Sequence, residues 1–176
     1  MASGFCNFNH CIFDSNTNDG ILMNGNAYMS VQDCDFYNNG RDGIEIAGTG
    51  GMVYCQNSNF LLNGRYGVEE VTGFTTQTIL VNCGYGSGSQ ANTSGNNTGV
   101  GIQETGAVTY ASGVTPWSAP TTGNFSITLA AAEGAGRGAF TETGASKSGT
   151  VGYPDIGAAQ HKSTGGGGTT GYAFAG

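Results

Sequence analysis

Apolar and polar residues alternate in short stretches through the first part of the chain. Two apolar residues, Cys11 and Phe13, are separated by one residue, and the same is true of Ile21 and Met23. A stretch that contains several polar residues, among them Asn, separates the two pairs. Alternation of this kind predicts short strands. Asn and Gly favour the turns between strands because both tolerate left-handed backbone conformations. The pattern therefore predicts an all-β chain of short strands and tight turns.

One frame recurs at intervals of 23 and 24 residues. The segments CIFDSNTNDGILM (11–23), CDFYNNGRDGIEI (34–46) and SNFLLNGRYGVEE (58–70) share the order (Cys/Ser)-x-Phe-x-x-Asn-x-x-x-Gly-(Ile/Val). A weaker fourth copy begins with Cys83 and Tyr85 and runs into the polar insertion 87–97. Helical repeats have longer periods, and leucine-rich repeats need more leucine than this chain contains. Short strands that recur at this period therefore predict a β-solenoid.

In a parallel β-solenoid each repeat of about 23 to 25 residues forms one coil. Successive coils stack about 4.8 Å apart, so equivalent residues form columns along the axis. We expect an aromatic column of Phe13, Phe36, Phe60 and Tyr85, a small-residue column of Cys11, Cys34, Ser58 and Cys83, an amide column of Asn16, Asn39 and Asn63, and an aliphatic column of Ile21, Ile44 and Val68.

The chain has five cysteines, and an odd number without a disulfide-rich pattern argues against a disulfide scaffold. Cys11, Cys34 and Cys83 recur at the coil spacing, not at the short spacing of zinc ligands. We interpret them as buried free thiols that fill the core. Because stacked coils bring Cys11 and Cys34 within reach of each other, one disulfide is the alternative.

Two groups of motifs resemble a known fold family. The phrases NNGRDGIEI (38–46) and LLNGRYGVEEV (61–71) resemble right-handed parallel β-helix proteins of the pectin-lyase-like superfamily. NFSITLAAAEGAGRGAF (124–140) and GYPDIGAAQH (152–161) resemble the closing segment of secreted bacterial and phage β-helix proteins. The second match is carried by Pro154, Asp155, Ile156, Gly157, Ala158 and Gln160.

The resemblance implies a right-handed, single-stranded parallel β-helix with a C-terminal β-rich capping segment. We place the coils in 1–102, the closing cap in 103–161 and a Gly-rich tail in 162–176. In the cap, four apolar residues are expected to fold over the last coil: Trp117, Phe125, Ile127 and Leu129. The tail is a flexible linker or a short docking segment through Tyr172 and Phe174.

Charge and composition exclude several function classes. The formal net charge is −7, and five Lys and Arg residues make no basic footprint, so we expect no nucleic-acid partner. The sequence contains no apolar run long enough to indicate a membrane span. Its first residues do not have the pattern of a signal peptide. The resemblance nevertheless implies an extracellular, cell-surface or virion location.

Enzyme motifs of the related superfamily are missing from the sequence. Its pectin-active hydrolases carry N-T-D, D-D, G-H-G and R-I-K motifs, and none occurs here. Its calcium-dependent lyases need clustered Asp residues and an Arg or Lys base. The cations available for that role are Arg41, Arg65, Arg137, Lys147 and Lys162. We therefore lean away from an enzyme, and a fragment of a tailspike-like polysaccharide lyase or glycoside hydrolase is the alternative.

One charged stripe is the candidate ligand-binding site. In the aligned coils Arg41 stacks on Arg65, Asp42 on Tyr66, and Glu45 on Glu69, and Glu45 is expected to point outward. A carboxylate pair at this spacing suits acid/base work on a glycosidic bond. The alternatives are a solvated charge stripe and a glycan groove in which Tyr66 and Tyr37 stack on sugar rings.

A second polar group comprises His10, Asp14, Asp33 and Asp35 on the outer face of the strand that carries the aromatic column. Such oxygen ligands suit Ca²⁺, although no loop has calcium-site spacing. Ordinary outward polar residues are the simpler interpretation, so we expect no cofactor. Three sequons, at Asn92, Asn96 and Asn124, match the N-glycosylation pattern.

These observations predict a structural or adhesive module of an extracellular or virion surface protein. It presents a polar face for glycan binding or for subunit assembly. Residues 1–4 are too few to cover Cys6, Phe8 and the coil end behind them. We therefore expect a homo-oligomer, filament or larger assembly that covers the N-terminal coil.

Overall fold

The computed structural model describes residues 4–48, 50–71, 76–129, 132 and 156–158. Strands dominate these residues, and the helical segments are two short 3-10 turns, η1 (Gly88–Gln90) and η2 (Pro120–Thr122). No helix in the described part of the chain is long and apolar enough to cross a membrane. The described chain is therefore all-β, as predicted.

Three parallel sheets form the walls of the molecule. Sheet A is built from β1 (Gly4–Asn9), β4 (Ala27–Gln32), β7 (Gly51–Gln56), β10 (Gln77–Val81) and β13 (Ile102–Thr105). Sheet B is built from β2 (Ile12–Asp14), β5 (Asp35–Tyr37), β8 (Asn59–Leu61), β11 (Gly84–Tyr85) and β14 (Val108–Thr109). Sheet C is built from β3 (Ile21–Met23), β6 (Ile44–Ile46), β9 (Tyr66–Glu70) and β12 (Gly95–Thr98).

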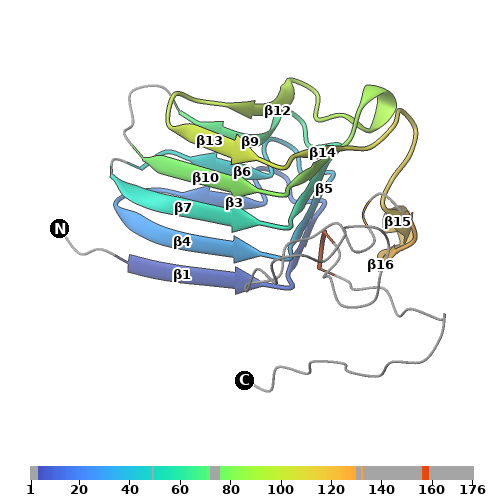
Figure 1. The fold of residues 1–176 in the computed structure, drawn as a ribbon, viewed down its shortest axis with the longest axis horizontal. Coiled ribbons are helices and arrows are strands. Elements are labelled where there is room, and N and C mark those ends of the chain that lie inside the picture. Colours follow the sequence, from blue (N-terminus) through green and yellow to red (C-terminus); the bar gives the residue numbers. More distant parts are fainter. Residues whose placement is uncertain (1–3, 49, 72–75, 130–131, 133–155, 159–176) are drawn as a thin grey trace, which may run out of the picture.

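The chain visits sheets A, B and C in turn, and each circuit stacks on the one before it (Figure 1). Phe13 pairs with Phe36 and Phe36 with Phe60, in the register that the sequence repeat predicts. The structure is a parallel β-solenoid of about four turns, which confirms the predicted fold class. Strands β13 and β14 begin a further circuit, so coil structure continues beyond residue 102.

Sharp corners join sheet A to sheet B in every coil. His10, Asp33, Asn57 and Asn82 occupy equivalent corner positions, with φ between 50° and 52°. Short polar side chains tolerate this left-handed conformation far better than branched ones do. The corner conformation therefore explains why Asn, Asp and His recur immediately before the small-residue column.

The aromatic column lies inside the solenoid, as predicted. The ring centroids of Phe13 and Phe36 are 4.8 Å apart, those of Phe36 and Phe60 are 4.7 Å apart, and both pairs are nearly parallel. Tyr85 continues the stack at 5.6 Å from Phe60. Phe36 and Phe60 have no exposed surface, so this column is the centre of the apolar core.

The small-residue column is a hydrogen-bond ladder as well as core filler. The Cys34 thiol accepts the backbone N–H of Cys11 at 3.5 Å, and the Ser58 hydroxyl accepts that of Cys34 at 3.2 Å. Cys34 also donates to the carbonyl of Gln32. Both Cys and Ser suit this column because each is small and offers both a donor and an acceptor.

All five cysteines are free thiols, so the alternative Cys11–Cys34 disulfide is not formed. Cys34 and Cys83 are buried, as predicted, whereas Cys11 is half-buried in the terminal coil. Cys55, which lies outside the repeat frame, is also buried and its sulfur lies 3.8 Å from that of Cys83. The buried thiols therefore come from the small-residue column, which precedes the strands of sheet B, and from sheet A.

The amide column forms the predicted ladder and extends one rung further. The Asn16 side chain donates to Asn39 Oδ1 at 2.8 Å, Asn39 to Asn63 at 2.9 Å, and Asn63 to Asn92 at 2.8 Å. Asn92 lies inside the polar insertion, 29 residues after Asn63. The extra residues, including η1, bulge outward while the ladder itself continues.

The hairpin that follows the coils lies on the side of the solenoid, and this corrects the expectation that its apolar residues fold over the last coil. Strands β15 (Trp117–Ala119) and β16 (Asn124–Ile127) form an antiparallel hairpin beside β5 (Figure 1). Trp117 and Phe125 pack edge-on against Tyr37, with ring centroids 5.4 and 5.9 Å away. This second apolar core covers the outer face of sheet B, because Tyr37 and Leu61 project there.

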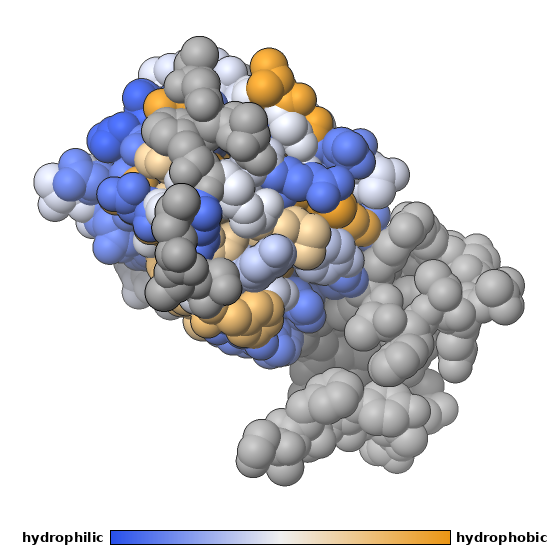
Figure 2. Space-filling view, turned by 90° about the vertical axis from the view of Figure 1, so that its left-hand side faces the viewer, coloured by the Kyte–Doolittle hydropathy of each residue, from blue (hydrophilic) through white to orange (hydrophobic). Residues whose placement is uncertain are grey.

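The side of the solenoid on which the strands of sheet A begin is a mosaic of hydrophilic and hydrophobic residues (Figure 2). Such mixing is ordinary for a protein surface. The surfaces with distinctive chemistry lie elsewhere, on sheet C and on the outer face of sheet A.

Candidate functional site

The predicted charged stripe is a real cluster, which we call the charged cluster. It comprises Asp19, Arg41, Asp42, Glu45, Arg65 and Glu69. Glu45 and Glu69 are directly opposite each other on β6 and β9, as the repeat predicted. Asp19 was not among the predicted residues, because the first repeat has no arginine at the position of Arg41 and Arg65. Asp19 nevertheless occupies the same position in the repeat as Asp42, 23 residues later.

Arg65 is the centre of the charged cluster. Its Nη2 atom contacts three carboxylates: Asp42, Glu45 at 2.9 Å and Glu69 at 2.5 Å. Arg41 contacts Glu45 and lies 3.5 Å from Asp19. Two guanidinium groups therefore link four carboxylates across three coils.

The carboxylates are less exposed than an outward position implies. Asp42 is fully buried and Glu45 is 7% exposed, because the two arginine side chains lie over them. One Asp42 oxygen accepts the backbone N–H of Tyr66 at 2.8 Å, and Asp19 accepts that of Asp42 at 3.1 Å. The expected solvated stripe is therefore corrected to a partly buried network that ties the coils together.

The titration behaviour follows from this packing. Burial lowers the pKa of Arg65, but the hydrogen bond to Asp42 and the surrounding carboxylates outweigh it, so its pKa is raised. The pKa of Glu69 is also raised, by burial first and then by the charge of Asp42, although Arg65 acts in the opposite direction.

These shifts bear on acid/base catalysis by the carboxylate pair. A raised pKa at Glu69 is what a general acid needs. However, Arg65 Nη2 contacts both Glu45 and Glu69 and so occupies the space between them. A sugar oxygen or a water molecule needs that space in glycoside hydrolysis. The charged cluster therefore holds the coils together, and it leaves no open space between Glu45 and Glu69 for a substrate.

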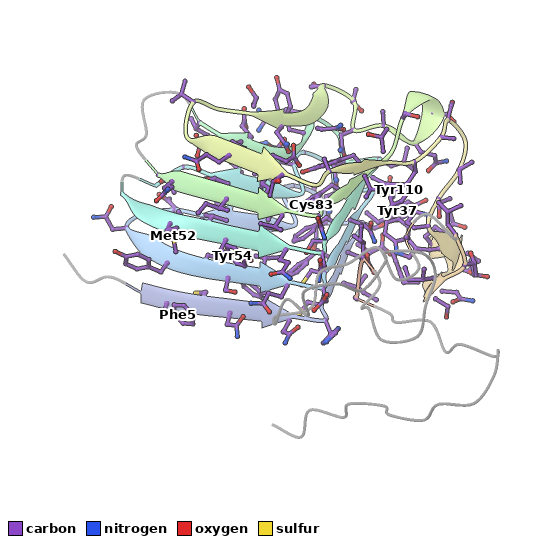
Figure 3. The ribbon with its side chains drawn as sticks, viewed as in Figure 1. Phe5, Tyr37, Met52, Tyr54, Cys83 and Tyr110 are labelled. Atoms are coloured by element: carbon purple, nitrogen blue, oxygen red, sulfur yellow. The ribbon has the colours of Figure 1, made fainter. Side chains whose placement is uncertain are left out.

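The two tyrosines expected to stack on sugar rings have different surroundings. Tyr37, which is labelled in Figure 3, is 5% exposed. It packs against Trp117 and Phe125, which corrects the prediction that it faces a ligand. Tyr66 is half-buried beside the charged cluster. Of the two, only Tyr66 offers accessible ring surface.

The polar group on sheet B is also used within the fold. Asp35 is fully buried, and its carboxylate accepts hydrogen bonds from the Asn59 side chain at 2.9 Å and the Ala158 N–H at 2.9 Å. Asp14, by contrast, is exposed and bonds to Ser15. A Ca²⁺ site built on Asp35 would have to displace Ala158. Among the described residues, the carboxylates that approach one another are instead Asp19, Asp42 and Glu45.

Residues 156–158 lie on this buried carboxylate and form a clasp, by which we mean Ile156, Gly157 and Ala158. Asn59 donates to the Ile156 carbonyl at 2.8 Å and accepts the Tyr110 hydroxyl at 2.5 Å. A Cβ on Gly157 would lie 2.5 Å from Asp35 Oδ1, and the residue has φ +117°, so only glycine fits there. The I-G-A part of the conspicuous phrase, residues 156–158, is thus a packing motif.

The buried setting raises the pKa of Asp35 to about 7. Loss of hydration is the main cause, and the charge of Asp33 adds to it. Hydrogen bonds from Asn59 and Ala158 favour the ionised form, as does the nearby Trp117 side chain.

The outer face of sheet A is the surface that the repeat analysis did not single out. Three columns of outward residues cross its strands. They are Phe5, Tyr28, Met52 and Gln77; Asn7, Ser30, Tyr54, Ile79 and Gln103; and Asn9, Gln32, Gln56, Val81 and Thr105. Figure 3 shows Phe5, Met52 and Tyr54 on this front sheet.

No residue on this face is charged, although the chain carries a net charge of −7. The one ionisable carboxylate in the five strands, Glu104, points inward and accepts the Tyr85 hydroxyl at 2.6 Å. Phe5 is 72% exposed and Tyr28 50% exposed, and the neighbouring side chains are mostly amides and hydroxyls. The face could have been found by reading the alternate residues of each strand, rather than the frame of conserved spacing.

Comparisons with known proteins add no further identification. A scan against protein-family models, a search of curated proteins and a search of solved structures each found no match. The class of protein defined by the fold is a parallel β-solenoid.

Proposed function

We propose that this chain is a carbohydrate-binding surface module that holds a neutral glycan on the outer face of sheet A. The observation that carries the proposal is the combination of exposed aromatic rings with amide side chains on an uncharged sheet face. Phe5 and Tyr28 are neighbours in one column, and Tyr54 lies on the next strand. No other described surface of the solenoid has this combination.

The chemistry of this face suits sugars. Aromatic rings offer large, rigid apolar surfaces against which the C–H faces of a sugar ring can pack. Asn and Gln side chains offer both donors and acceptors to hydroxyl groups. Gln32 already donates to Ser30 at 3.2 Å, and the Tyr54 hydroxyl donates to Gln56 at 2.6 Å. These contacts hold the polar groups in place along the sheet.

The absence of charge on this face selects the class of glycan. A carboxylate- or sulfate-bearing polysaccharide gains most from Arg or Lys partners. The arginines of the solenoid are instead paired within the charged cluster. Neutral chains, which need stacking and hydrogen bonds only, are the better match.

The wider setting belongs to the same proposal. Resemblance to pectin-lyase-like β-helix proteins supports an extracellular, cell-surface or virion location. It also supports an origin in the C-terminal part of a secreted bacterial or phage surface protein. Glycan cleavage is the weaker candidate, because Arg65 occupies the gap between Glu45 and Glu69.

The test is binding of the full chain to a panel of neutral and acidic polysaccharides by affinity electrophoresis and calorimetry. We expect retardation by at least one neutral polymer, and a loss of at least about tenfold in affinity for Tyr28→Ala and Tyr54→Ala. Tyr66→Ala is the matched control, because it removes a half-buried tyrosine from the charged cluster. Binding that survives both sheet A variants but is lost with Tyr66→Ala would place the site on the charged cluster instead.

A further inference from the structure

The two ends of the solenoid differ in chemistry. At one end lie the unpaired edges of β1, β2 and β3, and at the other those of β12, β13 and β14. An unpaired strand edge is a template for another strand, so the residues at each end decide whether the stack is built to stop there.

The end formed by β12–β14 is closed by polar residues on inward positions. Leu80 is followed in its column by Glu104, which accepts the Tyr85 hydroxyl at 2.6 Å and the Asn97 amide at 2.7 Å. Just below this end, at the last residue of β9, Ile46 is followed by Glu70, which accepts the Thr78 hydroxyl and the Gly101 N–H, both at 2.7 Å. Inward-pointing charges of this kind prevent further coils from stacking.

The end formed by β1–β3 has the opposite character, because its inward positions are apolar and uncovered by described residues. Cys6 is exposed, whereas Met29 in the next coil is 4% exposed. Phe13 is half-buried, whereas Phe36 beneath it has no exposed surface. The apolar core therefore runs open to this end.

The hydrogen-bond ladders are open at the same end and have a fixed direction. Asn39 Oδ1 accepts both the side-chain amide and the backbone N–H of Asn16, and Asn63 does the same for Asn39. No described residue donates in this way to Asn16 Oδ1. The thiol of Cys34 accepts the N–H of Cys11, and the Cys11 thiol is the next acceptor in that ladder.

We propose that the end face formed by β1, β2 and β3 is a docking surface for one further β-solenoid coil supplied by another polypeptide segment. The coil runs in the same parallel sense. It presents N–H donors to Asn16 Oδ1 and the Cys11 thiol, and an apolar or aromatic ring to Phe13. This interface continues the coil-to-coil contact already repeated through the molecule, and it is independent of the proposed glycan site.

The closed end of a second copy does not have this chemistry. Head-to-tail stacking would place Glu104 over Phe8, since both lie in the same column of sheet A. Burying the Glu104 charge against an apolar ring is costly, because its hydrogen-bond partners Tyr85 and Asn97 are both uncharged. Two copies meeting at their open ends would oppose Asn16 acceptor to acceptor. A further parallel coil is thus the occupant whose N–H donors match the acceptors of Asn16 and Cys11.

The experiment adds a coil of the proposed kind to the N-terminal end of the chain. Residues 27–50, which form the coil of β4–β6, are duplicated directly before Gly4, so that the copy of Ala27 pairs with Gly4 as Ala27 pairs with Gly51. We expect backbone amides 5–9 to exchange with deuterium at least about tenfold more slowly than in the unmodified chain. We also expect the melting temperature to rise by about 5 °C or more.

The matched control carries Phe36→Ser and Asn39→Ser in the added copy only, and we expect it to lose most of both effects. Three outcomes overturn the proposal. Amides 5–9 already protected in a dilute monomer would show that the end needs no coil. Protection that rises with protein concentration would make a second copy the occupant, and protection lost on deleting 162–176 would make it the chain's own tail.

Discussion

The backbone N–H of Ala158 donates a hydrogen bond to the carboxylate of Asp35, 123 residues earlier in the chain, over 2.9 Å. The contact fixes the clasp to the outer face of sheet B and leaves Asp35 without any exposed surface. The Asp35 carboxyl therefore holds the clasp in place, and it makes the stability of the folded chain depend on pH.

The first prediction concerns Asp35→Asn. In the folded chain burial raises the pKa of Asp35 to about 7 from 3.8. Between these values the folded protein holds a proton that the unfolded chain has released, so stability falls as pH rises. We expect the free energy of unfolding of the native chain, measured relative to Asp35→Asn, to decrease by roughly 2 to 4 kcal/mol from pH 4 to pH 8.

Urea unfolding of both proteins at several pH values measures this difference. Asp14→Asn is the matched control, because Asp14 is exposed and outside the clasp. A relative stability that is flat, or that increases with pH, would show that Asp35 is not held in the protonated form.

The second prediction concerns Arg65→Gln, which removes the cation shared by Asp42, Glu45 and Glu69. Breaking a buried ion pair from one side leaves uncompensated charge. The Arg65 side chain is 35% exposed, and water screens part of the loss. We expect a cost of about 2 to 3 kcal/mol by urea unfolding, against less than about 1 kcal/mol for Arg41→Gln.

An equal loss of unfolding free energy in the two variants would mean that Arg65 is no more important to the charged cluster than Arg41. A stabilised Arg65→Gln protein would show that the network serves a purpose other than holding the coils together.

The third prediction concerns the sequon at Asn92. This residue is 3% exposed, and its side-chain oxygen accepts two hydrogen bonds from Asn63. Asn92→Ala leaves those buried donors without a partner, so we expect a loss of about 2 to 4 kcal/mol in stability. Asn124→Ala, at an exposed sequon, should cost less than about 0.5 kcal/mol.

Secretion from a glycosylating host gives an independent measurement. Glycopeptide mass spectrometry of the folded protein should find Asn92 unmodified. A glycan on Asn92 in folded material would contradict the amide ladder.

The fourth prediction concerns thiol reactivity. Cys6 is exposed and Cys11 half-buried, whereas Cys34, Cys55 and Cys83 are buried. Burial raises the pKa of Cys34 to about 12, so little reactive thiolate forms there at pH 8. Titration with an aromatic disulfide should detect two accessible thiols in the native chain and all five in guanidinium. Rapid reaction of Cys34 in native protein would contradict the buried column.

Much of the architecture could be predicted from spacing alone. Identical intervals between Phe13, Phe36 and Phe60 imply stacking, because a solenoid turns a constant sequence period into a constant rise along its axis. The corner residues and the Asn ladder follow for the same reason. Asn92 was missed because an outward bulge changes the sequence interval without changing the position of the rung.

The position of the C-terminal hairpin could not be predicted in this way. Trp117 and Phe125 are apolar and non-repeating, which says that they pack somewhere but not where. The end of the last coil carries Glu104 on an inward position, whereas the outer face of sheet B offers Tyr37 and Leu61. The hairpin therefore packs on the side, where apolar surface is available.

The sequence by itself determined the coil, its period and the residues that line its core, because these depend on local pattern repeated at regular intervals. Tertiary structure alone decided the burial of Asp42 under Arg65 and of Asp35 under Ala158. It also decided which outer face is covered, since the hairpin packs on that of sheet B while Phe5 and Tyr28 on sheet A stay exposed. Burial and charge pairing depend on which segments meet in space, and a one-dimensional period carries no information on contacts between residues as distant as 35 and 158.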